Sequence, residues 1–140
     1  MIPLRNISLL CVLGTLSFSN VNYSFSQVNT FNIIGTWEGI DGTNTKANFI
    51  FNNDSTVLLI IAGDTAKPKN ATMTYRINYS VEPVSLDIIM GIRTEKEGYL
   101  RFIMKILSND KIMIAGGDLP NRRPSDFNKK SNVCELNRRK

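Results

Sequence analysis

The sequence predicts an all-β protein: a single small antiparallel, up-and-down β-barrel or half-open barrel of about eight strands. Three observations predict this fold. Apolar and polar residues alternate with a period of two over most of the chain, as in strands with one buried face. Turn-forming residues interrupt the alternation about every ten positions. After the N-terminal apolar run, no stretch shows the period of an amphipathic helix.

The predicted strands cover residues 33–40, 45–52, 56–62, 72–80, 86–92, 99–107 and 111–116, with a short eighth strand placed at 132–137. The strand at 72–80 shows the alternation most clearly, because Tyr75, Ile77 and Tyr79 share one face. Residues 56–62 are apolar on both faces, so we expect another part of the chain to cover their outer face.

Turn chemistry supports antiparallel neighbours. The pair Asn53 and Asp54 joins the second strand to the third, and Asn109 and Asp110 join the sixth to the seventh. Asn and Asp tolerate the positive φ that tight hairpins need. Residues 63–71 form the longest polar connection and are predicted to be a loop.

The composition allows one domain and argues against an enzyme. The chain has 140 residues and no His, which excludes Ser-His-Asp and Cys-His nucleophiles and His metal sites. Most Asp residues stand at predicted turns, and Asp87 is predicted to lie at the surface, on the polar side of its strand. We therefore expect no catalytic residues, no cofactor and no metal site.

The N-terminus predicts export. One Arg precedes an uncharged apolar run at 7–18, which is too short to span a bilayer and is typical of a signal peptide. Ser24, Phe25 and Ser26 then offer a small-x-small cleavage site. Residues 1–26 are predicted to be the signal peptide and 27–140 the mature domain, periplasmic or extracellular, with no transmembrane span after cleavage. The alternatives are a buried N-terminal helix and an uncleaved anchor.

The mature chain has a single cysteine, Cys134, so it cannot close an intramolecular disulfide. Its charge is uneven: residues 27–120 carry nine Lys and Arg against ten Asp and Glu, whereas residues 121–140 carry seven against two. Such a basic end could meet an anionic surface or simply keep the terminus soluble. No aromatic residues interleave its charges, so we expect no nucleic-acid partner.

The tripeptide GTW at 35–37 is the most informative local motif. Trp37 is the only Trp, and its ring is predicted to plug one end of the barrel, while Gly35 lets a neighbouring chain approach closely. A cation from the C-terminal segment would lie over the ring, with Arg122 and Arg123 as the candidates.

Further short motifs follow GTW along the chain, and in combination with it they support the barrel prediction: YRI at 75–77, Pro83, LDI at 86–88 and RPSDF at 123–127. In this order the chain resembles the small lipocalin-like proteins of bacterial envelopes. The resemblance covers most of residues 33–139 and implies an antiparallel barrel or half-open barrel. This chain is shorter than a typical lipocalin and lacks the disulfide that many lipocalins carry.

Two functions follow as expectations. The first is an exported binding protein for a small apolar or amphipathic ligand, held among inward-facing side chains: Phe49, Phe51, Tyr75, Ile77, Tyr79, Ile88 and Met90. The second is an envelope interaction module, or a protease-inhibitor-like barrel, whose interior is simply filled.

The segment with Arg123, Pro124 and Phe127 is predicted to be a structural clasp across one end of the barrel. Pro124 fixes φ and favours an extended Arg123, which would aim the guanidinium at Trp37. Phe127 would turn back into the same apolar end. The competing interpretation is a solvated basic patch for an anionic partner.

Overall fold

The structure, a computed structural model, describes residues 30–65, 72–91, 98–119 and 121–140. The predicted signal peptide at 1–26 and most of the predicted loop at 63–71 lie outside the described residues.

The described chain forms an all-β fold, as predicted. The strands are β1 (Gly35–Asp41), β2 (Lys46–Phe51), β3 (Val57–Ile61), β4 (Asp64–Thr65), β5 (Met73–Asn78), β6 (Val84–Met90), β7 (Gly98–Ser108), β8 (Lys111–Gly116) and β9 (Val133–Arg138). One 3-10 turn at Lys130–Asn132 precedes β9.

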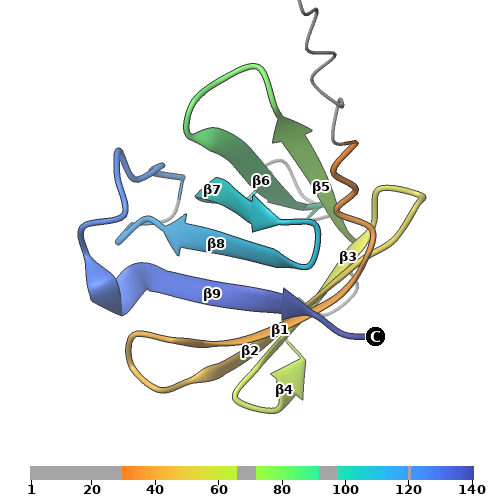
Figure 1. The fold of residues 1–140 in the computed structure, drawn as a ribbon, viewed down its shortest axis with the longest axis horizontal. Helices are drawn as coiled ribbons and strands as arrows, with labels where there is room; N and C mark the ends of the chain where they lie inside the picture. Colours follow the sequence, from red (N-terminus) through yellow and green to blue (C-terminus); the bar gives the residue numbers. More distant parts are fainter. Residues whose placement is uncertain (1–29, 66–71, 92–97, 120) are drawn as a thin grey trace, which may run out of the picture.

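The strands form one antiparallel sheet in the order β4-β3-β2-β1-β9-β8-β7-β6-β5. Figure 1 shows that the sheet curls into a half-barrel. Successive strands are neighbours, except that β4 and β5 lie at the two edges of the sheet. The last strand, β9, pairs with β8 and also with β1, which joins the two halves of the sheet. The predicted eighth strand at 132–137 is therefore β9, and the additional strand is the two-residue β4.

The two edges of the sheet meet at one point only, so the barrel is half-open. Thr56 and Thr74 form an isolated antiparallel bridge between the segments that carry β3 and β5. Beside it, the Tyr75 amide donates to the carbonyl oxygen of Ser55 at 2.9 Å. The Tyr75 hydroxyl also donates to the carbonyl oxygen of Asn52, at 2.9 Å. These contacts pin the start of β3 to β5 without a continuous ladder.

The hairpins occur where the sequence predicts them. The positive φ of the β2–β3 turn falls on Ser55, at 66°, one residue beyond the predicted Asn53 and Asp54. The strand predicted at 86–92 begins earlier, at Val84. On β3, Leu58 and Ile60 are half-buried, so the outer face of this strand is covered in part.

The core follows the alternation of the sequence. In β2, the buried positions are Ala47, Phe49 and Phe51, and the positions between them are half-buried. The side chains with less than 2% exposure come from almost every strand: Trp37, Phe51, Leu59, Leu86, Ile88, Ile103, Met104, Ile112 and Leu136. Each buried side chain of this size contributes about 1.5–3 kcal/mol of transfer free energy, so the core stabilises the fold without a disulfide.

Candidate ligand-binding cavity

One end of the half-barrel is filled by Trp37. This end is formed by the β2–β3, β5–β6 and β7–β8 turns and by the segment before β1 (Figure 1). The Trp37 side chain is 0% exposed, and its indole nitrogen donates to the carbonyl oxygen of Ile33 at 2.7 Å. The ring of Phe31 lies 6.0 Å from that of Trp37, centroid to centroid. The predicted plug is therefore present.

The cation over this ring is Arg138, not Arg122 or Arg123. Its guanidinium carbon lies 4.3 Å from the Trp37 ring centroid. The register of β1 and β9 pairs Trp37 directly with Arg138, which places the two side chains together. Gly35 has a φ of 128°, and a Cβ there would lie 3.1 Å from Arg138 Nη1, so glycine gives the guanidinium its space.

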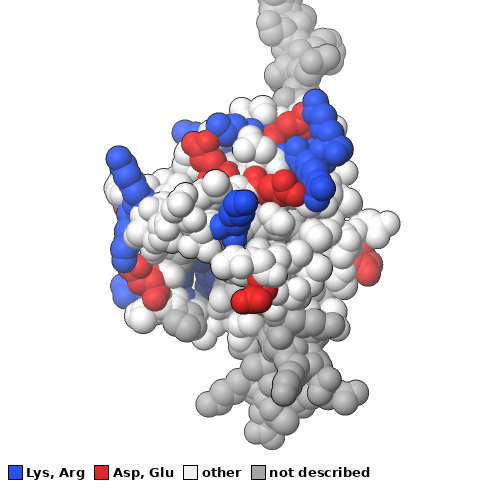
Figure 2. Space-filling model, turned by 90° about the horizontal axis from the view of Figure 1, so that it is seen from below, with Lys and Arg blue, Asp and Glu red and all other residues white. Residues whose placement is uncertain are grey.

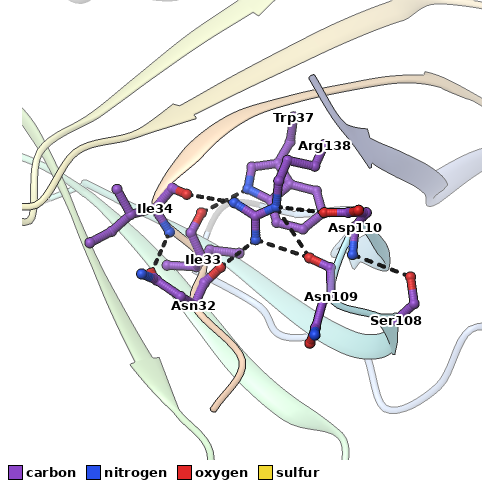
Figure 3. A network of polar contacts seen from close by, with 8 residues as sticks. All are labelled: Asn32, Ile33, Ile34, Trp37, Ser108, Asn109, Asp110 and Arg138. Carbon is purple, nitrogen blue, oxygen red and sulfur yellow. Dashed lines mark hydrogen bonds and ion pairs between the residues drawn. The ribbon is translucent and has the colours of Figure 1, made fainter. Parts of the chain in front are cut away.

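Arg138 joins three segments of the chain (Figure 3). Its Nη1 donates to the carbonyl oxygen of Ile34 at 2.6 Å, and its Nη2 to that of Asn32 at 2.5 Å. On the other side, Nη2 and Nε donate to the carbonyl oxygen of Asn109 at 3.0 and 3.2 Å. Nε also lies 3.2 Å from Asp110 Oδ1. The segment before β1, the β7–β8 turn and the end of β9 are thus held by one side chain.

The opposite end of the half-barrel holds an apolar cavity of about 250 Å³. Its apolar lining comes from five strands and consists of Ala47, Phe49, Leu59, Ile61, Leu100, Phe102, Ile114 and Cys134. Polar groups stand at Asp41, Ser131 and Asn132, and the backbone of Gly116 and Gly117 completes the wall. Of the predicted interior residues, Phe49 alone lines this cavity.

The other predicted interior residues lie elsewhere. Phe51 and Ile88 are buried in the packed core, at 1% and 0% exposure. Tyr75, Ile77 and Met90 are partly buried and pack against that core. The prediction for Tyr79 is wrong, because β5 ends at Asn78 and the Tyr79 side chain is 50% exposed in the following turn.

Sequence reasoning missed most of the cavity lining. Leu100 and Phe102 alternate with polar positions in β7, and that pattern marks them as inward-facing. No local pattern marks Ala47 or Gly116 as the places where the interior is left unfilled. Ala47, Gly116 and Gly117 are the small residues in the cavity wall, and they stand among larger apolar side chains.

Cys134 lies in the wall of the cavity and is buried. Burial raises the pKa of its thiol to about 11, and the nearby Asp41 and Glu135 carboxylates act in the same direction. The thiol is therefore protonated at neutral pH and behaves as an apolar wall group.

Arg123 does not lie at the filled end, where the clasp was predicted, but on the wall of the half-barrel. Its Nη2 lies 2.5 Å from Asp87 Oδ1, and its Nη1 donates to the carbonyl oxygen of Phe102 at 2.5 Å. The β8–β9 connection thus folds over the outer face of β6 and β7. Asp87 is consequently buried, at 8% exposure, which corrects its predicted surface position. Among the described residues, it is the one buried charged residue.

The two other residues of the predicted clasp also lie away from Trp37. Pro124 lines a polar cavity of about 460 Å³ under the β8–β9 connection. Phe127 is half-buried and is not among the side chains that pack against the core. The 123–127 motif therefore covers the wall of the half-barrel, and the clasp at the filled end is made by Arg138.

The basic C-terminal segment is largely paired with acidic groups. Arg123 binds Asp87, Lys129 binds Asp118, Arg138 binds Asp110, and Arg139 Nη1 lies 3.2 Å from Glu38 Oε1. On the face seen in Figure 2, basic and acidic side chains lie beside one another with wide uncharged areas between them. Four of the seven basic residues of this segment therefore have an acidic partner among the described residues, in contrast to an unopposed basic patch.

Comparison with protein-family models, with curated proteins and with solved structures finds no match to this chain. In the part of the chain that the structure describes, no helix has the length and apolar character needed to cross a membrane. Within the same residues, no group of three or more His, Cys, Asp or Glu side chains could hold a metal ion.

Proposed function

We propose that this protein is an exported, lipocalin-like binding protein without catalytic activity, which holds a small apolar ligand in the cavity at the open end of its half-barrel. One observation carries the proposal. The filled end is packed around Trp37, whereas the other end leaves about 250 Å³ surrounded by apolar side chains. Apolar cavities of this kind bind apolar molecules because water gains few hydrogen bonds inside them.

The size of the cavity sets the ligand class. Drug-sized ligands occupy pockets of about 300–1,000 Å³. The cavity here is smaller, so it suits a compact apolar molecule or the end of an alkyl chain. Among the described residues, no basic side chain lines it, and its polar groups are Asp41, Ser131 and Asn132. The part of the ligand that enters the barrel therefore carries no negative charge.

The experiment is an NMR titration with straight-chain alcohols from butanol to octanol. We expect saturable shifts in the amide signals of Phe49, Phe102 and Ile114, with affinity that rises with chain length at about 0.8 kcal/mol per buried methylene group. Ala47→Leu fills the cavity and should abolish these shifts. Asn48→Leu adds the same side chain to the opposite face of β2 and should leave them unchanged.

Equal binding by the parent protein and Ala47→Leu would contradict the proposal, as would the absence of saturable shifts with every alcohol. The second candidate function, an envelope interaction module, then becomes the better account. Four exposed apolar side chains at the filled end favour that alternative: Ile34, Tyr79, Val81 and Leu107. The interaction-module alternative predicts that a partner protein binds at the turns of the filled end, and that Ala47→Leu does not change its affinity.

A further inference from the structure

The outer face of β5, β6 and β7 carries three arginines around one aspartate. The strand register pairs Asp87 with Arg76 on one side and with Arg101 on the other. Arg123 reaches the same aspartate from the β8–β9 connection. Three guanidinium groups therefore share a single carboxylate on the wall of the half-barrel.

Asp87 does not satisfy all three cations. Its Oδ1 is 2.5 Å from Arg123, which makes the strong pair of the cluster. Arg76 is 3.7 Å from Oδ2 and its side chain is 67% exposed, so that pair is weak and solvated. No ion pair between Asp87 and Arg101 is found among the described residues, although the two face each other across the ladder.

Arg101 is the arginine of this cluster for which no ion pair is found among the described residues. Its guanidinium carbon lies over the Tyr99 ring, 5.1 Å from the centroid, in a cation–π contact. Its Nε is buried and has no hydrogen-bond partner. A buried donor without an acceptor is costly, and a charged one more so. The side chain is thus positioned and charged, with a donor that nothing in the described chain accepts.

A cavity of about 240 Å³ lies beside this group. Tyr99, Arg101, Phe102 and Leu119 line it together with Asp118 and the backbone of Gly116 and Gly117. The Asp118 carboxylate accepts at Oδ1 from Lys129 and from the Asn132 amide, the latter at 2.6 Å, so the Lys129 ammonium offsets its charge. Among the described residues that line this cavity, Arg101 is the one cationic side chain, and no ion pair of Arg101 is found in the described part of the chain.

We propose that this cavity binds a small oxyanion, a carboxylate or phosphate group on a compact molecule, with Arg101 as its anchor. Arg101 lines the cavity, and its planar head group can bind two oxygens of a carboxylate or phosphate group at once. Arg76 and Arg123 add positive potential that exceeds the charge of Asp87. The adjoining Phe102 and Leu119 accept the apolar part of the molecule.

The test follows the Arg101 Nε–H signal by NMR while phosphate, sulfate or butyrate is added to the protein. We expect a saturable downfield shift with at least one of these anions. Arg101→Gln should weaken binding by about tenfold or more, because it removes both the charge and the fork of donors. Lys105→Gln removes an exposed positive charge from the same strand and should change the affinity less than about twofold.

Stability measurements distinguish a loss of anion binding from a loss of folding. Because the Arg101 head group makes no ion pair with the described residues, Arg101→Gln should melt within a few degrees of the parent. Arg101→Lys keeps the charge and loses the planar fork, so it should bind with intermediate affinity. Parent and Arg101→Gln proteins with equal affinity would overturn the proposal, and so would a parent protein that binds none of the three anions or the vesicles described next.

The same oxyanion chemistry has two sources, a free metabolite and a lipid headgroup. Sedimentation with vesicles of phosphatidylglycerol in phosphatidylcholine separates them. Arg101-dependent binding to these vesicles, absent with phosphatidylcholine alone, assigns the site to an anionic headgroup. Saturable binding of free anions without vesicle binding assigns it to a soluble ligand. The two cavities share Leu100, Phe102, Gly116 and Gly117 in their walls, so the variants separate the two proposals. Arg101→Gln tests the anion site, whereas Ala47→Leu tests the apolar cavity through the alcohol titration.

Discussion

Replacing Arg138 with Ala should loosen the filled end of the half-barrel more than any other single change to a charged residue of the C-terminal segment. The side chain is 21% exposed, and it holds the segment before β1, the β7–β8 turn and the Trp37 ring together. Its removal deletes a cation–π contact and a set of charge-assisted hydrogen bonds at once.

The magnitude follows from these contacts. A partly desolvated cation–π contact contributes about 0.5–2 kcal/mol. A hydrogen bond to a charged group contributes about 1.5–3 kcal/mol when its partner is left unsatisfied. The carbonyl groups that Arg138 contacts belong to exposed or half-buried residues, so water replaces part of the loss. The free energy of unfolding should therefore fall by about 2–4 kcal/mol, or roughly 8–16 °C in Tm for a domain of this size.

Thermal and denaturant unfolding, followed by the fluorescence of the single Trp, measure this loss. Arg139→Ala is the matched control, because Arg139 is 68% exposed and pairs only with Glu38 at the surface. Its cost should stay below about 0.5 kcal/mol. The Arg138 loss should persist in high salt, since most of its partners are carbonyl groups and a ring.

Arg138→Lys should recover part of the stability, because it restores the charge without the fork that spans three carbonyl groups. If Arg138→Ala and Arg139→Ala melt alike, the filled end is not held by this side chain. A loss that vanishes in high salt would instead mean that the ion pair with Asp110 dominates.

Three further predictions concern the core, the wall and the cavity. Trp37→Ala should cost about 3–5 kcal/mol, as is usual for a large buried aromatic, and an unmoved denaturant midpoint would refute its place in the core. Asp87→Ala should cost about 2–3 kcal/mol, because it leaves Arg123 partly buried without its partner, whereas Arg76→Ala should cost less than about 0.5 kcal/mol. Similar melting of these two variants would contradict the assigned pairs. Cys134 has a thiol pKa of about 11, above that of an unfolded thiol, so iodoacetamide at pH 8 should modify it in denaturant and not in the folded protein. The thiol's contribution to stability is fully present below about pH 8.5 and is lost as the pH rises through 11. Rapid labelling of the folded protein would show that the cavity wall is open to solvent.

Most of the strands could be predicted from the sequence because alternation is a local signal. Met73, Tyr75 and Ile77 share one face whatever their neighbours are, and the β5 strand follows from that pattern. Tyr79 fits the same alternation, yet the strand ends before it. Where a strand ends depends on its partner: β5 and β6 pair as far as Asn78 and Ser85, and the chain then turns.

The contacts between distant segments could not be predicted in the same way. A cation over Trp37 was expected from the C-terminal segment, and the choice between Arg123 and Arg138 depends on the pairing of β9 with β1. Asp87 has the sequence environment of a surface residue, and it is buried by a segment 36 positions further along the chain. The wall of the apolar cavity likewise combines small and larger residues from strands that are distant in the sequence.

Native mass spectrometry of the protein taken from its own host would detect a ligand retained in the apolar cavity. We expect a mature chain that begins near Gln27 and carries one small apolar molecule, and we expect that Ala47→Leu, expressed in the same host, carries none. A bare chain from the host, with the parent and Ala47→Leu identical in mass apart from the substitution, would contradict a ligand in the cavity at the open end of the half-barrel.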